Sequence, residues 1–259
     1  MNSTMLNAPM HPSIGMLDGK VAVITGAGRG IGKATAQVFV REGAKVLLAD
    51  ISGAEVEVAA ELGPNALPFH CDVSQQDQVE AMFAHALTVF GRVDALINVA
   101  GTLGSRRPEF TLEEYEEMTA VNLRGVLLCT QSAIRTMVTS GGGAVVTIST
   151  VGALNAEERA SVVYAAAKAG VNALTKSFAV QYGAQGIRVN AMASGITRTE
   201  RYQTAPADAI RELNAKAAMR RAAESEEQAQ VAAFLASDRA SFITGAIIPV
   251  DGGWSARLA

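Results

Sequence analysis

The sequence predicts an α/β fold built on one doubly wound sheet of seven parallel strands, with helices on both faces. Short apolar runs alternate with longer amphipathic runs along the chain, which is typical of successive β-α-β units. At 259 residues the chain suits a single domain, and 49% hydrophobic residues suffice for a sheet buried on both faces. A glycine-rich turn joins the first strand to the first helix.

That first strand is Lys20-Val-Ala-Val-Ile-Thr25. The turn Gly26-Ala-Gly28-Arg29-Gly30-Ile31-Gly32 follows it and leads into an amphipathic run over residues 33–42. Glycine lets the backbone approach a pyrophosphate, and the first helical amides lie at the positive end of the helix dipole. We therefore expect a dinucleotide to be bound by Gly26, Arg29, Gly30, Ile31 and Gly32.

The second strand, Lys45-Val-Leu-Leu-Ala-Asp50, ends in an acid 18 positions after Gly32. This is close to the spacing of about 20 at which a carboxylate binds a ribose hydroxyl. Asp50 would repel a 2′-phosphate, so NAD(H) is favoured over NADP(H), with Ile51 beside the same ribose. Arg29 in the turn favours NADP(H), but no Arg or Lys follows Asp50 within residues 51–53 to neutralise it.

Five further strands are expected to begin near Leu67, Ala95, Val145, Arg188 and Ala246. Polar side chains stand where several strands end, at Thr25, Asp50, Asp72, Asn98 and Ser149-Thr150. Because the carboxyl ends of parallel strands meet at one edge, they predict one shared site. Asp72 could accept a hydrogen bond from an adenine amine, or it could cap the next helix, a role that Ser74 could also fill.

Tyr164 and Lys168 are four residues apart in a helical run, which puts a phenol and an ammonium on one face. A phenol is a poor base at neutral pH unless a fixed cation stabilises its phenolate. The pair therefore predicts a proton-transfer device. A surface pair without a catalytic role has the same spacing.

These motifs together resemble the short-chain dehydrogenase/reductase family, and the resemblance covers about Leu17 to Trp254. The family's cofactor turn is matched by Thr25-Gly26-x-x-x-Gly30-x-Gly32, and its adenine-contacting segment by Cys71-Asp72-Val73. Its usual Asn-Asn-Ala-Gly is matched, with one substitution, by Asn98-Val99-Ala100-Gly101. Its closing segment resembles Ile243-Thr244-Gly245 and Val250-Asp251-Gly252-Gly253.

The resemblance implies a Rossmann-type sheet of order 3-2-1-4-5-6-7 and hydride transfer between a nicotinamide and a secondary alcohol or its ketone. Tyr164 would exchange the proton, Lys168 would lower its pKa, and Asn122 would kink its helix and hold a water; a helix asparagine with satisfied hydrogen bonds is the other interpretation of Asn122. The resemblance adds further cofactor contacts at Asp72, Val73, Asn98, Ala100, Gly101, Tyr164, Lys168, Thr197 and Thr199.

Two positions depart from the family pattern. The family's catalytic serine stands 13 residues before the tyrosine, whereas this chain has Ser149 and Thr150 at 15 and 14. We favour Thr150 as the catalytic hydroxyl, with Ser149 as the alternative; the threonine methyl narrows the pocket. Ser194-Gly195 replaces the usual Pro-Gly, which leaves that turn less rigid.

A substrate lid is expected over about residues 196–221. Its arginines could bind an anionic substrate, although solvated helix faces balanced by Glu200, Asp208 and Glu212 are the simpler interpretation. Residues 157–159, two acids and an arginine, are interpreted as a solvated loop tip. The family usually forms tetramers through long helices, here over residues 111–138 and 161–182, so a homotetramer is expected.

Composition narrows the remaining function classes. A net charge of −3 without a basic run argues against a nucleic-acid partner. No apolar stretch is long enough to span a bilayer and residues 1–16 do not resemble a signal peptide, so we expect a cytoplasmic protein with a disordered N-terminal extension over 1–16 and one domain over 17–259. Cys71 and Cys129 are interpreted as buried thiols, and no metal site is expected.

Two alternatives stay open: an NADPH-dependent 3-oxoacyl-carrier-protein reductase, and a non-catalytic dinucleotide sensor or scaffold. Arg29 and the closing segment would allow the first, and Asp50 disfavours it. The replacement of serine by Thr150 would allow the second, and the presence of Asn122, Tyr164 and Lys168 speaks against it.

Overall fold

The computed structural model describes residues 15–104, 109–156 and 161–257. Its main sheet has seven parallel strands in the order β3-β2-β1-β4-β5-β6-β9, which confirms the predicted topology. The strands are β1 (Val21–Thr25), β2 (Lys45–Asp50), β3 (Ala66–His70), β4 (Ala95–Asn98), β5 (Gly143–Thr150), β6 (Ile187–Ser194) and β9 (Ile247–Val250). A small separate ladder, β7 (Thr197–Arg198) with β8 (Ala223–Glu224), was not predicted, because two-residue strands leave no periodic pattern.

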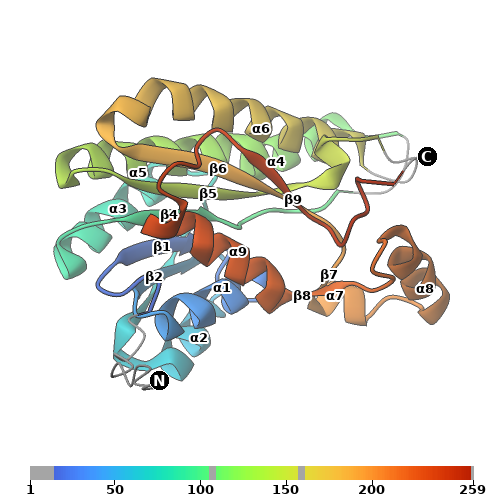
Figure 1. Ribbon diagram of the computed structural model, residues 1–259, viewed down its shortest axis with the longest axis horizontal. Coiled ribbons are helices and arrows are strands. Elements are labelled where there is room, and N and C mark those ends of the chain that lie inside the picture. Colours follow the sequence, from blue (N-terminus) through green and yellow to red (C-terminus); the bar gives the residue numbers. More distant parts are fainter. Residues whose placement is uncertain (1–14, 105–108, 157–160, 258–259) are drawn as a thin grey trace, which may run out of the picture.

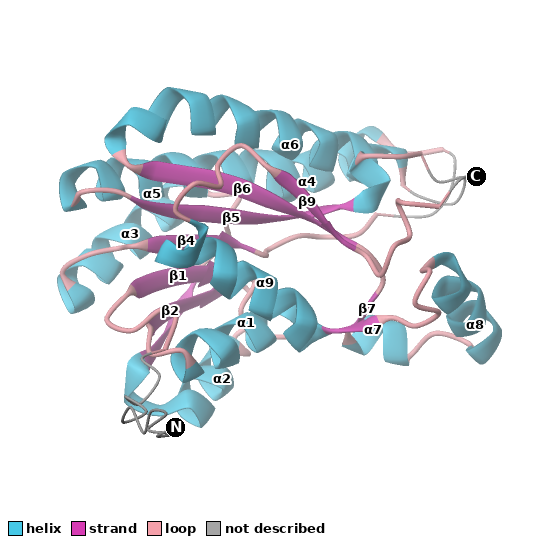
Figure 2. Ribbon diagram, viewed as in Figure 1, coloured by secondary structure: helices cyan, strands magenta, loops and turns pink. Residues whose placement is uncertain are grey.

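Helices cover both faces of the sheet (Figure 1). One layer contains α1 (Gly30–Arg41), α2 (Glu55–Leu62) and α9 (Ser225–Ala236), and the other contains α3 (Gln76–Phe90), α4 (Leu112–Thr119), α5 (Val126–Ser140) and α6 (Val162–Tyr182). Two short helices, α7 (Glu200–Gln203) and α8 (Ala207–Lys216), stand beyond the ends of the strands (Figure 2). Single 3₁₀ turns are η1 (Gly63–Asn65), η3 (Val151–Ala153), η4 (Gly183–Gln185) and η5 (Asp238–Ala240).

The central strands are buried on both sides because successive side chains alternate between the faces. In β1, Ala22 and Ile24 pack with the α1, α2 and α9 layer, whereas Val23 packs with the opposite layer. This two-sided burial explains why these strands appear in the sequence as continuous apolar runs.

The predicted helix over 111–138 is interrupted by a π-helical turn, η2 (Ala120–Gly125), between α4 and α5. Asn122 lies within this turn, so the regular α-helix is interrupted at the residue where a kink was expected. Such turns widen a helix and are frequent at functional sites.

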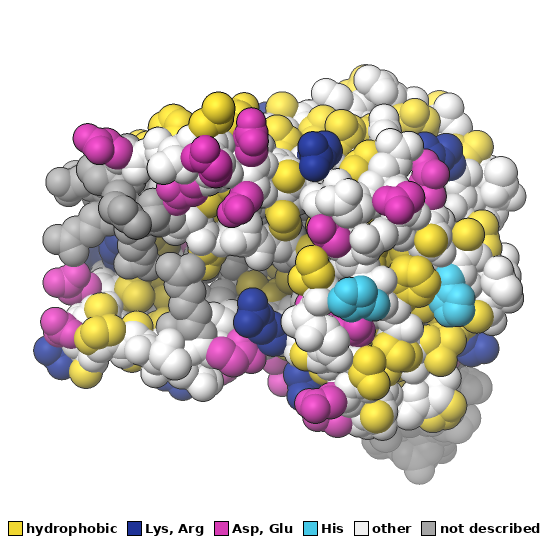
Figure 3. Space-filling model, turned by 180° about the vertical axis from the view of Figure 1, so that it is seen from behind, with side chains coloured by type: hydrophobic (Ala, Val, Ile, Leu, Met, Phe, Trp, Pro, Cys, Tyr) yellow, Lys and Arg dark blue, Asp and Glu magenta, His cyan; other side chains and the backbone are white. Residues whose placement is uncertain are grey.

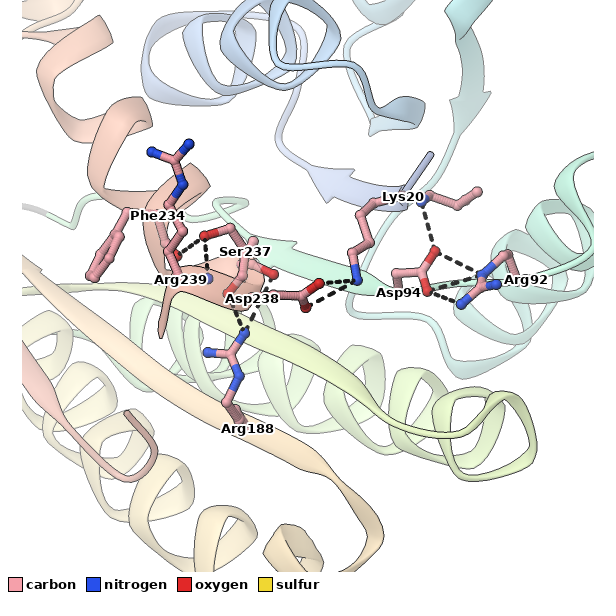
Figure 4. A network of polar contacts seen from close by, with 10 residues as sticks. Lys20, Arg92, Asp94, Arg188, Phe234, Ser237, Asp238 and Arg239 are labelled. Carbon is pink, nitrogen blue, oxygen red and sulfur yellow. Dashed lines mark hydrogen bonds and ion pairs between the residues drawn. The ribbon is translucent and has the colours of Figure 1, made fainter. Parts of the chain in front are cut away.

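A polar network closes the amino-terminal edge of the sheet, opposite the predicted site (Figure 4). Asp94 is buried, accepts a hydrogen bond from the Val21 amide at 2.8 Å and pairs with Arg92. Arg188 donates to the carbonyls of Leu235 and Ser237, which end α9. The network thus joins the starts of β1, β4 and β6 to the end of α9.

Both cysteines are free and buried, as interpreted from the sequence, and burial raises the pKa of the Cys71 thiol to about 12. Across the described ranges, none of the helices combines the length and the apolar character needed to cross a bilayer.

Candidate active site

The residues predicted to bind and react lie along the carboxyl-terminal edge of the sheet. The glycine turn follows β1, Asp50 ends β2, Asn98 ends β4 and Thr150 ends β5. In the turn, α1 begins at Gly30 with Arg29 at its N-cap. A Cβ on Gly32 would stand 1.9 Å from the carbonyl oxygen of Gly26, so only glycine lets the helix start this close to the strand.

Asp50 is held by the glycine turn itself. Its Oδ2 accepts a hydrogen bond from the Gly28 amide and its Oδ1 accepts one from the Ser52 amide, both at 2.9 Å. Burial alone would raise the pKa of this carboxyl, but the hydrogen bonds from the two amides, together with the Ser52 hydroxyl and the Arg29 charge, outweigh burial and hold the pKa below its ordinary value. Each carboxylate oxygen keeps a further lone pair for a ribose hydroxyl. Arg29 is exposed and its charge also reaches Asp50.

Two predicted contact residues have side chains that belong to the core. Asn98 Nδ2 donates to the hydroxyls of Thr130 and Thr147, and Val73 is 7% exposed in the apolar layer under α3 and α5. At Asn98 and Val73, therefore, only backbone groups could contact a ligand. Asp72 accepts a hydrogen bond from the Ser74 amide, while α3 has Gln75 at its N-cap without a side-chain bond; the capping role considered for Asp72 and Ser74 was therefore wrong.

Thr25 is a site residue whose role the sequence did not reveal. Its hydroxyl accepts the amides of Val99 and Ala100, each at 3.2 Å. This bond fixes the turn after β4 beside the glycine turn after β1. The position of Thr25 directly before Gly26 was the feature of the sequence that could have indicated this role.

Tyr164 and Lys168 lie on one face of α6, as predicted. The hydroxyl of Ser161 caps this helix by accepting the Tyr164 amide, which sets the phenol in the first turn. Lys168 Nζ is 5.8 Å from the Tyr164 ring centroid and donates to the carbonyl of Ile148 in β5 at 2.7 Å. Lys168 is 3% exposed, which excludes the surface-pair interpretation.

The pKa of Tyr164 differs from our expectation. We expected Lys168 to lower it, but burial raises the pKa of the phenol to about 12. Burial also lowers the pKa of Lys168 to about 8, because an ammonium is poorly solvated there. At neutral pH the site therefore holds a protonated phenol beside an ammonium.

Asn122 provides an unpaired oxygen next to that ammonium. Its Nδ2 donates to the carbonyls of Thr102 and Met118, whereas its buried Oδ1 has no hydrogen-bond partner within the described ranges. A Cβ on Gly101 would stand 2.8 Å from this Oδ1 and 3.7 Å from Lys168 Nζ. Gly101 therefore leaves room that both polar atoms border, and an orphaned buried acceptor of this kind calls for a water or a ligand donor.

The two candidate hydroxyls after β5 have different surroundings. Ser149 is 1% exposed and its Oγ lies 3.5 Å from the Lys168 carbonyl, inside the packed layer. Thr150 is half-buried at the strand end, where its Oγ1 accepts the Gly152 amide at 3.2 Å. Having accepted that bond, Thr150 can still donate its own hydrogen.

The segment after β6 lies across this edge. Thr199 Cγ2 is 3.2 Å from the position of a Cβ on Gly30, and Glu200 Oε1 is 3.4 Å from the Gly30 amide. No local pattern could predict the contact between Glu200 and Gly30, because the two residues are 170 positions apart in the chain. Thr197 lies between Ser194 and Thr199 in the same segment.

Two of the lid arginines pair with acids at the start of α9, which are not the acids expected to balance them. Arg198 pairs with Glu224 at 3.1 Å, and Arg221 makes two bonds to Glu227 at 2.6 and 2.8 Å. The guanidinium groups of both arginines are therefore already paired with carboxylates. The loop tip over 157–159 and residues 1–14 lie outside the described residues, so those predictions stay predictions.

These features fit a nicotinamide dinucleotide: a helix amino end at a glycine turn, a carboxylate at the end of β2 and an orphaned acceptor beside a buried lysine. A family profile described as enoyl-(acyl carrier protein) reductase matches residues 26–255. Cis-4-hydroxycyclohexanecarboxylate dehydrogenase of Sinomonas cyclohexanicum is 42% identical over 243 residues, covering 92% of this chain and 97% of that protein. Levodione reductase of Leifsonia aquatica is 39% identical over 267 residues, covering 97% and 99%. A crystal structure of levodione reductase superposes with a TM-score of 0.88 at 37% identity, covering 93% of this chain and all of that one.

Proposed function

Because the chain belongs to the short-chain dehydrogenase/reductase family of oxidoreductases, we propose that it interconverts a small secondary alcohol and its ketone with NAD(H), and that Tyr164 exchanges the proton. The observation that carries this proposal is the Tyr164 phenol beside the buried Lys168 ammonium, at the sheet edge that also carries Asp50. One relative is named for a cyclic alcohol, cis-4-hydroxycyclohexanecarboxylate, which makes such compounds the first substrates to try.

The cofactor is held by residues that the fold gathers from four strand ends. The Gly30–Gly32 amides at the start of α1 would face the diphosphate, and Asp50 would accept hydrogen bonds from the adenosine ribose. A 2′-phosphate would meet the Asp50 carboxylate, whose lowered pKa keeps it ionised, so NAD(H) is preferred over NADP(H). When bound, the nicotinamide supplies or accepts the hydride.

The protein's own residues move the proton. With its pKa raised, Tyr164 is a proton donor at neutral pH, which suits ketone reduction. Alcohol oxidation needs the phenolate, so its rate should increase with pH up to about pH 8, above which Lys168 loses the positive charge that lies near the phenol ring. Thr150 would donate a hydrogen bond to the substrate oxygen, and the unpaired Asn122 Oδ1 would hold a water near Lys168.

We also propose a substrate lid over about 196–221 and assembly as a homotetramer. The lid proposal is supported by α7 and α8, which stand outside the two helical layers (Figure 1). Assembly is supported by exposed hydrophobic side chains on the outer helices, including Val138 of α5 and Val162 and Val180 of α6. Hydrophobic side chains are visible along the upper edge of the molecule from behind, where α6 lies in Figure 1 (Figure 3). Light scattering on the purified protein tests the tetramer.

Titration with NADH and NADPH separately, followed by turnover on a panel of cyclic and linear ketones, tests the function. Preference for NADH with turnover of any ketone supports the proposal, and preference for NADPH supports the acyl-carrier reductase instead. Tight binding without turnover supports a sensor. Tyr164→Phe should lose nearly all turnover and still bind NADH, whereas Tyr182→Phe, at the far end of the same helix, should keep both.

A further inference from the structure

The backbone from Ser194 to Thr199 connects the reactive end of the site to the glycine turn. Ser194 ends β6 and is the register partner of Thr150 in β5. Five residues on, Thr199 packs against Gly30 with its Cγ2 3.2 Å from the position of a Cβ there. A dinucleotide that reaches from Gly30 to Thr150 would therefore pass close to this segment.

Two hydroxyls hold the first turn of the segment. Ser194 Oγ lies 3.3 Å from Thr197 Oγ1, and the Gly195 carbonyl lies 3.2 Å from the first hydroxyl and 3.4 Å from the second. The Gly195 amide donates to the Val250 carbonyl at 3.0 Å, which fixes the turn to the end of β9. Ser194 is only 8% exposed, so its hydroxyl is committed to this turn.

Each hydroxyl carries one hydrogen, so the two cannot both donate to Gly195 and to each other at once. With Ser194 donating to the Thr197 hydroxyl, Thr197 keeps its own hydrogen for a ligand. Thr197 is half-buried and lies between the catalytic edge and the contact of Thr199 with Gly30. Its hydroxyl is thus placed on the half of the path nearest Thr150.

We propose that Ser194 is a positioning residue for the nicotinamide half of the cofactor, acting through the Thr197 hydroxyl; the inference rests on the proposed function. A proline at this position would restrain the turn by fixing φ. Ser194 instead restrains the turn through the hydrogen bonds of its side chain. The adenosine half is held by Asp50 and the glycine turn, away from Ser194. Loss of the Ser194 hydroxyl should therefore affect only one half of the ligand.

Calorimetric titration of Ser194→Ala with NADH and with ADP-ribose, which lacks the nicotinamide ring, separates the two halves. The dissociation constant for NADH should increase about three- to tenfold, as expected for one lost hydrogen bond, while that for ADP-ribose stays unchanged. Thr197→Val should show the same selective loss. The double variant should lose less than the sum of the two single losses, because both variants break one linked arrangement.

Ser194→Thr keeps a hydroxyl and should restore much of the NADH affinity, and Ser140→Ala, at the opposite edge of the sheet, should change neither ligand. An unchanged NADH affinity in Ser194→Ala, or an equal loss for both ligands, overturns the inference while the proposed function stands. A wild-type protein that binds neither ligand overturns both.

Discussion

Lys168 is a buried cation whose removal should stabilise the fold. Burial lowers its pKa from 10.5 to about 8. Since a change of one in pKa is worth about 1.4 kcal/mol, keeping the ammonium charged at neutral pH costs the folded state about 3 kcal/mol. Lys168→Met removes this cost but leaves the Ile148 carbonyl without its donor, which costs about 1 kcal/mol. The variant should be about 2 kcal/mol more stable than the wild type at pH 7 and should lose turnover.

This advantage should disappear as the pH rises. Between pH 8 and 10.5 the unfolded chain binds the lysine proton more tightly than the folded protein does. Wild-type stability therefore increases with pH over this range, whereas the methionine variant lacks that contribution. The difference in free energy of unfolding should fall to near zero by about pH 10.

Urea denaturation followed by circular dichroism at several pH values measures both quantities. Lys176→Met is the matched control, because Lys176 is exposed on the same helix. The control should change stability little at any of these pH values. A Lys168→Met variant that is less stable than the wild type at pH 7, or a difference that does not vary with pH, would refute the reasoning.

Three further outcomes are expected. Asp50→Ala should narrow the NAD advantage over NADP in kcat/KM, since it removes the carboxylate that a 2′-phosphate would meet; an unchanged ratio would count against this role. Thr150→Val should lower kcat at least about tenfold, whereas Ser149→Ala should lower it less, because the Ser149 hydroxyl is buried against α6; the opposite ranking would make Ser149 the catalytic hydroxyl. Asp94→Asn should cost about 2 kcal/mol in urea denaturation by weakening the bonds to Arg92, with unchanged turnover per folded molecule; loss of turnover would contradict the placement of this network away from the site.

Local patterns in the sequence were enough to predict the sheet and the residues gathered at its edge. Strands buried on both faces appear as short apolar runs, and glycine is required where α1 begins against β1. Residues that end successive parallel strands must share one edge, so Asp50, Asn98 and Thr150 could be placed together before any contact was known. The spacing of Tyr164 and Lys168 likewise depends only on helix geometry.

The tertiary structure decided what those side chains contact and how they are charged. The pKa of Tyr164 depends on how deeply α6 packs, and packing brings together residues far apart in the chain. Asn98 and Val73 belong to the core because of neighbours on other elements, and the same holds for the Ser194–Thr197 hydroxyl pair beside Thr150. The sequence thus determined which groups are present and along which edge they lie, because periodicity and strand ends are local. Burial and hydrogen-bond partners are properties of the packed chain, and only the fold determines them.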